Sequence, residues 1–377
     1  MPQFLAPPSP VPLGSTIPVL TTGSSSAGQP GLPRSGPLLD RWGRTATDLR
    51  ISLMDKCNLR CVYCMPAEGL KWLPGRQLLT LEEVTRLVRV GVQELGIEEV
   101  RFTGGEPLVR ADLIDIIAAV RAEHPRLPIA LTTNGIGLEK KVEALVQAGL
   151  NRVNVSLDTI CPETFAQLTR RDKLAAVLAG IEAAAAAGLT PLKINAVLMA
   201  GINDNQGHEL LAWALDGGYQ LRFIEQMPLD ADHSWTREGT ITAEQIRQHL
   251  ADHYDLRPQA QPRGSSPAAL WDVYPLGSAS RTEPLGQVGI IASVTEPFCS
   301  ACTRTRITAD GKVRSCLFSL TETDLLGALR SEVSDEQLAQ IWRGAMWAKP
   351  RAHGKDRPGF EAADFTQPDR PMSAIGG

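Results

Sequence analysis

The stretch DKCNLRCVYCMPAE, Asp55 to Glu68, places Cys57, Cys61 and Cys64 in a C-x3-C-x2-C spacing. Three thiolates on one short loop can ligate three irons of an iron–sulfur cube, which leaves the fourth iron open to an outside molecule. A structural zinc site would normally show a fourth Cys or His at ligand spacing, but the next cysteine is Cys161. Three cysteines cannot all pair as disulfides. The spacing therefore predicts an open iron–sulfur cluster.

The whole chain has the composition of a soluble globular protein: 377 residues, 43% hydrophobic, 21% charged, with a net charge of −4. Basic residues do not outnumber acidic ones and form no run, which argues against a nucleic-acid partner. No apolar stretch approaches the length of a membrane span. The start lacks the basic region of a signal peptide, since no charge precedes Arg34. Seven cysteines without an export signal predict a reducing, cytoplasmic compartment and metal ligation.

Hydrophobic periodicity alternates between strand and helix from about residue 48. Helices are expected at 80–95, where Thr80 and Glu83 form a capping box, from about 112, and at 138–148, 173–187 and 205–216. Strands are expected at 48–53, 98–103, 128–133, 151–157, 191–198 and 219–225. Six successive βα units imply an α/β fold with a parallel sheet, and the pattern alone leaves open a doubly wound sheet or a barrel.

The regions on either side of this core, residues 45–230, differ from it. Residues 1–44 are rich in Pro, Ser and Gly, and we expect a disordered extension. Residues 231–347 read as a smaller α+β module, and residues 348–377 as a tail that ends in Gly376-Gly377. The module's expected elements are helices at 242–254, 321–331 and 334–347, strands near 270–275, 287–292 and 304–308, and a hairpin turn at Asp310-Gly311 leading into 312–316.

A second cysteine group, Cys299, Cys302 and Cys316, lies in this module with C-x2-C-x13-C spacing. It favours a second open cluster. A Cys3His zinc site is the alternative, and His353 is its only downstream candidate.

Basic residues interrupt strands that should be apolar. Buried parallel strands normally read as Val/Ile/Leu runs, yet four of the six carry Arg50, Arg101, Lys193 or Arg222. Arg304 and Arg306, two apart beside Cys302, would face one side of an extended segment. Unpaired buried charges are costly, so an anion must complete the site, and a nucleoside triphosphate carries enough charge. Arg152 is expected to form a salt bridge or to face solvent.

The segment Thr103–Pro107, TGGEP, follows the second strand. Two glycines allow close backbone approach to a ligand, and Glu106 could accept from an ammonium or hydroxyl group. An ordinary Gly-Gly turn is the alternative.

The cysteine spacing, with Tyr63 before the last cysteine, and the GGEP segment resemble the radical S-adenosylmethionine (SAM) enzymes. The resemblance implies a partial (β/α)6 TIM-type barrel and a [4Fe–4S] cluster whose open iron chelates SAM, which the reduced cluster cleaves to a 5′-deoxyadenosyl radical. Matched position by position, the implied SAM contacts are Tyr63, Gly104, Gly105, Glu106, Ser156 and Met227.

From about Leu49 to the end, the resemblance narrows to the GTP 3′,8-cyclase family of molybdenum-cofactor biosynthesis. It rests on CxxCTRTR, ADGKVRSCLF, RFIEQMP, KINAV and the Gly-Gly end. It implies a lyase whose second [4Fe–4S] cluster, on Cys299, Cys302 and Cys316, holds the substrate. The implied GTP contacts are Arg50, Arg101, Thr132, Lys193, Arg222, Arg304, Thr305 and Arg306, and the implied catalytic residues are Arg50, Arg304, Arg306, Gly376 and Gly377. Glu99 departs from the family, which commonly has Lys there.

The resemblance also implies a homodimer, an electron donor of flavodoxin or ferredoxin type, and possible contact with the next enzyme, cyclic pyranopterin monophosphate synthase. Two other functions stay open. One is another radical SAM enzyme with an auxiliary cluster, such as a peptide-modifying enzyme. The other is a non-catalytic metal-binding or electron-transfer protein.

Overall fold

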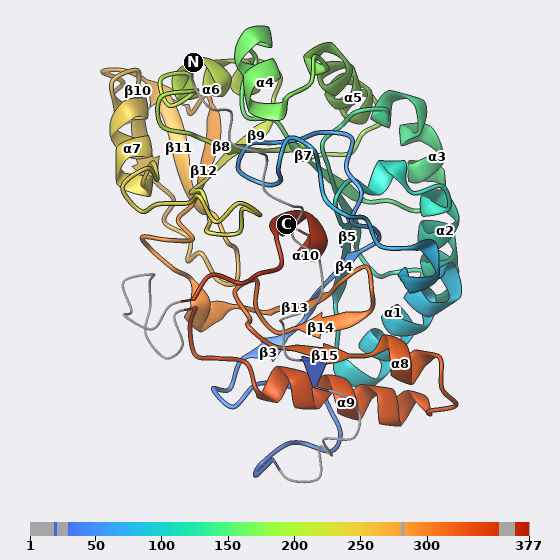
Figure 1. Cartoon of the computed structure of the whole chain (residues 1–377). Helices are drawn as coiled ribbons and strands as arrows, with labels where there is room; N and C mark the ends of the chain where they lie inside the picture. The colour runs from blue at the N-terminus through green and yellow to red at the C-terminus, as the bar shows by residue number, and fades with distance from the viewer. Residues whose placement is uncertain (1–18, 21–28, 280–282, 354–365, 377) are drawn as a thin grey trace, which may run out of the picture.

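Six parallel strands form the centre of one curved sheet (Figure 1). The computed structural model describes residues 19–20, 29–279, 283–353 and 366–376 of the chain. Every neighbouring pair among the six is parallel. The strands are β4 (Asp48–Ser52), β5 (Glu99–Thr103), β6 (Ile129–Thr133), β7 (Arg152–Ser156), β8 (Lys193–Val197) and β9 (Gln220–Ile224). The predicted parallel sheet of six βα units is confirmed.

Helices cover the outer face of this curved sheet, as Figure 1 shows. They are α1 (Leu81–Leu95), α2 (Leu113–Glu123), α3 (Val142–Gln147), α4 (Pro162–Thr169), α5 (Leu174–Ala186) and α6 (Gly207–Asp216). The expected capping box opens α1, where Thr80 accepts from Glu83 N and the Glu83 side chain accepts from Thr80 N. Apolar faces of these helices pack on the strands in one continuous core.

The C-terminal module extends the sheet at both edges. Beyond β9 lie β12 (Gly286–Ile291), parallel to it, then β11 (Ala269–Pro275) and β10 (Tyr254–Pro258). Beyond β4 lie β13 (Arg304–Ile307), parallel to it, then β14 (Lys312–Arg314), β15 (Glu322–Asp324) and β1 (Val19–Leu20). The module therefore closes around the barrel opening instead of forming a separate body.

Longer and shorter helices of the C-terminal half pack around this core. Helix α7 (Ala243–Ala251) packs beside α6, and α9 (Asp335–Trp347) lies along α1. The short α10 (Met372–Ile375) lies at the centre of the curved sheet (Figure 1). The tail thus enters the barrel interior.

The N-terminal part of the chain differs from the expected disorder over residues 29–44. This segment holds β2 (Leu38–Leu39), which pairs with β3 (Thr45–Ala46), and its side chains donate hydrogen bonds to the start of the C-terminal tail. Apart from Val19–Leu20, the remainder of the predicted extension lies outside the described residues, as does Gly377.

Three local predictions are corrected. The eight-residue α4 was missed. The helix expected to reach 254 ends at Ala251, so that β10 begins at Tyr254. The helix expected over 321–331 is a strand, β15, followed by the one-turn α8 (Leu326–Leu329). No helix in the described part of the chain combines the length and apolarity needed to span a bilayer.

Candidate active site

The first cysteine group lies on the loop that follows β4, and the TGGEP segment supports this loop. Gly105 N donates to Met54 O at 2.7 Å and Glu106 N to Lys56 O at 2.8 Å. A Cβ atom on Gly105 would collide with the carbonyl oxygens of Asp55 and Lys56. Close backbone approach is therefore required here, as the sequence indicated, but the approaching group is the cysteine loop.

Glu106 is buried beneath this loop. Its carboxylate accepts from Leu108 N (2.9 Å), Thr133 Oγ1 (2.7 Å) and Asn134 N (2.6 Å). Burial raises its pKa to about 7, against the effect of these hydrogen bonds. Glu106 thereby fixes Asn134, whose Nδ2 lies 3.7 Å from Cys57 Sγ. The contact of Glu106 with the amino group of SAM stays a prediction.

The cysteine loop fits a three-thiolate iron–sulfur site. Leu59 N donates to Cys57 Sγ at 3.4 Å, an interaction that suits a cluster-bound thiolate. Burial raises the pKa of Cys57 to about 11 and that of Cys64 to about 12, so these groups need a bound cation to be thiolates near neutral pH. Beside them, Tyr63 donates from its hydroxyl to Asp158 Oδ2 at 2.7 Å.

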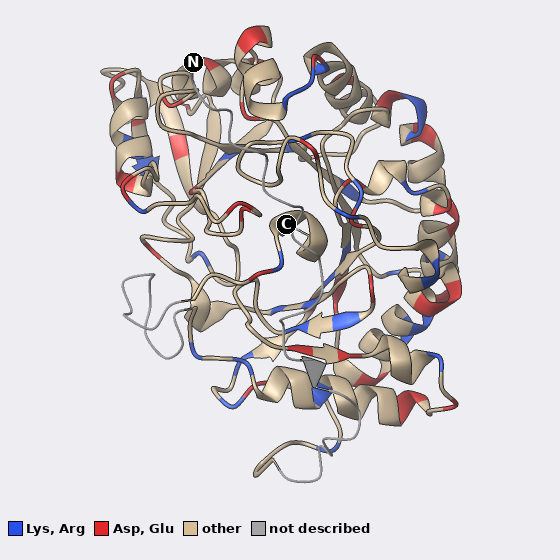
Figure 2. Ribbon diagram, in the orientation of Figure 1, with Lys and Arg blue, Asp and Glu red and all other residues tan. Residues whose placement is uncertain are grey.

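A cavity of about 680 Å³ occupies the barrel interior. Tyr63, Ser156 and Met227 line it, as do all three cysteines of the second group. Basic side chains from five strands of the sheet also line it: Arg50, Arg101, Lys193, Arg222, Arg304 and Arg306. In Figure 2, Lys and Arg positions are coloured along β4, β13 and β14 below α10. The predicted convergence of Arg and Lys on one cavity is present.

Burial affects these cations strongly. Desolvation lowers the pKa of Lys193 to about 8, of Arg222 to about 9 and of Arg101 to about 10, and neighbouring cations add to each shift. The Nε atoms of Arg50, Arg101 and Arg222 are buried and have no hydrogen-bond partner within the described part of the chain. Buried donors without partners, next to like charges, are the arrangement that a polyanion would satisfy.

Among the described residues, few groups neutralise these positive charges. Asp48 Oδ2 lies 3.3 Å from Arg50 Nη2 and 3.6 Å from Arg304 Nε. Burial would raise the pKa of Asp48, but the surrounding guanidinium groups outweigh this and lower it. With its amide oxygen turned inward, Asn154 accepts from Arg101 Nη1 at 2.7 Å and Arg222 Nη2 at 3.1 Å.

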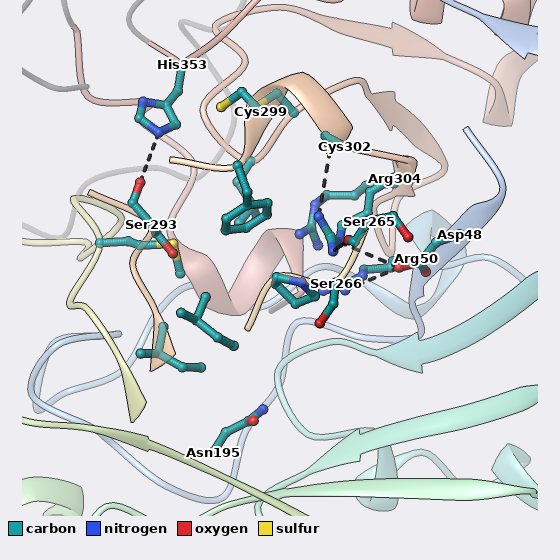
Figure 3. Close-up of a pocket in the computed structure, with 18 of the residues that line it drawn as sticks. Asp48, Arg50, Asn195, Ser265, Ser266, Ser293, Cys299, Cys302, Arg304 and His353 are labelled. Atoms are coloured by element: carbon teal, nitrogen blue, oxygen red, sulfur yellow. Dashed lines mark hydrogen bonds and ion pairs between the residues drawn. The ribbon is translucent and has the colours of Figure 1, made fainter. Parts of the chain in front are cut away.

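The second cysteine group lies beside the basic side chains. Figure 3 shows Cys299 and Cys302 near Arg304, with Arg50 and Asp48 beyond it. Cys302 Sγ lies 3.4 Å from Lys349 Nζ and 3.8 Å from Arg304 Nη1. Although burial raises the pKa of Cys302, these two cations lower it to about 6, which suits a metal-ligating thiolate. His353 is the candidate fourth ligand of the alternative zinc site. Its Nε2 atom lies within hydrogen-bond distance, 2.9 Å, of the main-chain oxygen of Ser293.

The tail reaches the same cations. Gly376 O accepts from Arg306 Nη1 at 2.9 Å, and Ile375 O accepts from Ser52 Oγ at 2.6 Å. Gly376 has φ +83°, and a Cβ atom there would collide with Ser52 Oγ and Thr103 Cγ2. Only glycine fits this position without a shift.

Comparisons with known proteins match both halves of this architecture. The Radical SAM superfamily matches residues 51–214, and Molybdenum Cofactor Synthesis C matches residues 219–355. A GTP 3′,8-cyclase from Paenarthrobacter nicotinovorans is 60% identical over 343 residues, which cover 90% of this chain and 97% of the relative. One from Mycolicibacterium smegmatis is 55% identical over 367 residues, covering 97% and 99%. This chain belongs to the GTP 3′,8-cyclase family.

A distant solved structure supports the fold of this cyclase-family chain. The crystal structure of Streptococcus suis SuiB aligns with a TM-score of 0.52 at 15% identity, covering 79% of this chain and 65% of that chain. At this identity the likeness supports the fold alone.

Most residues expected to contact GTP line the cavity, including Thr132. Thr305 differs: its hydroxyl accepts from Trp342 Nε1 at 2.9 Å, and it is not among the residues that line the cavity. It lies between Arg304 and Arg306 on β13, and alternation along the strand turns it to the opposite face. Its side chain is therefore unsuited to contact GTP. Glu99 pairs with Arg152 at 2.5 Å, which confirms the expected salt bridge of Arg152.

Sequence reasoning missed several polar residues of the cavity. Asn154 and Asn195 lie on buried strands, so they carry the same signal that singled out the basic residues. Asp48, Asp158 and Lys349 also line the cavity. Lys349 follows α9 in the Pro-containing tail, where no periodic pattern marked it.

Proposed function

We propose that this chain converts GTP into (8S)-3′,8-cyclo-7,8-dihydroguanosine 5′-triphosphate. The observation that carries the proposal is one cavity that joins six basic side chains to the second cysteine group and reaches Tyr63 beside the first. A triphosphate would neutralise these buried cations, whose Nε atoms at Arg50, Arg101 and Arg222 have no hydrogen-bond partner among the described residues. A nucleoside end would extend toward Cys299, Cys302 and Cys316.

The chain's own residues bind and orient the substrate in this proposal. Arg50, Arg304 and Arg306 would neutralise phosphate charge from β4 and β13, while Lys193 and Arg222 do so from β8 and β9. Two sets of cations on opposite sheet regions would hold the substrate in one orientation, which restricts it to a reactive geometry. Family membership supports GTP as the nucleotide.

Two [4Fe–4S] clusters and SAM would complete the site, on Cys57, Cys61 and Cys64 and on Cys299, Cys302 and Cys316. When bound, the first cluster and SAM would supply a 5′-deoxyadenosyl radical able to take the ribose 3′ hydrogen of GTP. Closure of the bond from C3′ to C8 of guanine would then need one further electron and a proton to give the 7,8-dihydro product. The residues that would position SAM are Tyr63, Gly104, Gly105, Glu106, Ser156 and Met227. The tail, through Gly376 O on Arg306, would orient a guanidinium and keep water from the reacting atoms.

Further parts of the proposal follow from the resemblance and the chemistry. The enzyme would be a lyase, active as a homodimer in the cytoplasm. All seven cysteines are free thiols in the structure, which suits a reducing compartment. A flavodoxin or ferredoxin would donate electrons, and the next pathway enzyme would receive the product.

The decisive experiment uses protein reconstituted anaerobically with iron and sulfide, then given dithionite and SAM with GTP, ATP or no nucleotide. Mass spectrometry reads 5′-deoxyadenosine and any cyclised nucleotide. A GTP-dependent burst of both supports the proposal. If SAM is cleaved at the same rate with or without a nucleotide, the protein is better explained as another radical SAM enzyme. If SAM is not cleaved although the protein carries about eight irons per chain, a non-catalytic protein is favoured.

A further inference from the structure

Lys349 is a buried cation whose contacts lead to one cysteine of the second group. Its residue is 3% exposed, and Nζ lies 3.4 Å from Cys302 Sγ and 3.0 Å from Arg304 O. Among the described residues, no carboxylate forms an ion pair with Lys349. A buried ammonium group needs a negative partner, and the one that the structure provides is the Cys302 thiolate.

The surrounding chain fixes Lys349 firmly in this position. Its carbonyl accepts from Trp42 Nε1 at 3.1 Å, and the next two carbonyls, of Pro350 and Arg351, accept from Arg44 at 2.6 and 2.8 Å. Arg44 Nη1 also donates to Cys299 O at 2.7 Å. The segment before β4 thus ties Lys349 and the cysteine turn to one support.

Lys349 also differs from the other cation near this sulfur. Arg304 bonds to Ser265 O and lies near Asp48 as well as Cys302, and it faces the cavity as a proposed GTP contact. The two hydrogen bonds of Lys349 Nζ go instead to the sulfur and to the main chain of β13. Lys349 also lines the cavity, but both of these contacts are with the protein, so the chain itself holds the ammonium group at the sulfur.

We propose that Lys349 is a positioning residue that tunes the reduction potential of the auxiliary cluster by donating a charge-assisted hydrogen bond to Cys302 Sγ. Reduction adds a negative charge to an iron–sulfur cluster, and a nearby cation stabilises the reduced form. Lys349 thus raises the potential, so that the proposed flavodoxin or ferredoxin can reduce the auxiliary cluster. The reduced cluster would then supply the one electron that, with a proton, converts the cyclised radical into the 7,8-dihydro product. This inference rests on the proposed second cluster.

The test compares Lys349→Met, which removes the charge at similar length, with Lys349→Arg, which keeps it. Both are made in the full chain with Cys57, Cys61 and Cys64 changed to Ala, so that only the auxiliary cluster reports. Lys141→Met is the matched control, because Lys141 Nζ also donates to a main-chain carbonyl, Leu108 O, at 2.8 Å but contacts no cysteine sulfur. Iron content and an EPR-monitored redox titration are measured for each.

We expect Lys349→Met to load about four irons and to shift the reduction equilibrium toward the oxidised form at least tenfold, which is about 59 mV for one electron. Lys349→Arg and the control should stay near the parent. An unchanged potential in a loaded Lys349→Met protein would overturn the inference. So would loss of iron from both Lys349→Met and Lys349→Gln, because Lys349 would then serve assembly. A parent without iron would instead refute the proposed second cluster.

Discussion

At the scale of single residues, Gly376 joins the tail to the cations of the cavity. Its φ of +83° and the crowding of its Cα against Ser52 and Thr103 leave no room for a side chain. We expect Gly376→Ala to displace the carbonyl from Arg306 and to slow cyclisation roughly ten- to a hundredfold, since such strain costs about 1–3 kcal/mol. Removal of Gly376 and Gly377 should abolish cyclisation while iron content stays normal.

Gly36 offers a matched control for this substitution. It has the same φ of +83°, but a Cβ atom there would meet nothing within 4 Å. Gly36→Ala carries the backbone penalty without the collision. Product formation and iron content are measured for both variants, and equal activity of the two alanine proteins would refute the role assigned to the tail.

Lys193 should make GTP binding depend on pH. Burial and nearby cations lower its pKa to about 8, so the free enzyme loses this charge as the pH rises through 8. GTP prefers the charged form, and its dissociation constant should increase above pH 8, by at most about tenfold per unit for one proton. Anaerobic titration calorimetry from pH 7 to 9 measures this. Lys193→Gln should bind more weakly at pH 7 and show a flatter profile; the same steep rise in that variant would assign the effect elsewhere.

At the scale of elements, Glu225 connects the barrel to the C-terminal module. Glu225 is the residue directly after β9. Its carboxylate accepts hydrogen bonds from Ala243 N at the start of α7 (2.7 Å), from Val294 N (2.7 Å) and from Thr295 N (2.9 Å). Glu225→Gln would turn an amide N–H toward these donors, and we expect it to lower the free energy of unfolding by about 2–3 kcal/mol. Thermal unfolding of the anaerobic protein checks this value.

Glu244→Gln is the control for that change, because Glu244 lies in the first turn of the same helix but is exposed and pairs with Arg247. It should leave the melting temperature almost unchanged, because an exposed ion pair contributes little to stability. Similar losses for both variants would mean that Glu225 contributes no more than an exposed carboxylate.

The elements also show what the sequence could and could not predict. Local periodicity sufficed for β4 to β9 because each strand and each helix is encoded by its own short stretch of sequence. The basic residues were recognisable because they interrupt apolar strands. The pairing of β12 with β9 and of β13 with β4 could not be predicted. β13 lies some 250 residues after its partner, and no local pattern encodes such contacts. The positions of Lys349 and Arg44 at the cysteine turn depend on that closure.

At the scale of the whole molecule, positively charged side chains from both edges of the central sheet line one cavity. Arg304 and Arg306 on β13 join Arg50 on β4, while Lys193 and Arg222 come from β8 and β9. Their mutual repulsion opposes closure of the sheet around the cavity, and a bound polyanion relieves it. GTP at a hundredfold excess over its dissociation constant should therefore stabilise the fold by about 2.7 kcal/mol, and added salt should reduce this gain.

Asp48→Asn separates this electrostatic account from simple binding. Asp48 supplies negative charge to Arg50 and Arg304, at 3.3 and 3.6 Å, so its loss should lower the melting temperature of the free protein and enlarge the increase that GTP produces. Asp112→Asn is the control, because Asp112 pairs with Arg110 at 2.7 Å and neither residue lines the cavity. It should lower the melting temperature and leave the GTP-induced increase unchanged. If Asp48→Asn and Asp112→Asn respond to GTP alike, repulsion among the cavity cations is not what the substrate relieves.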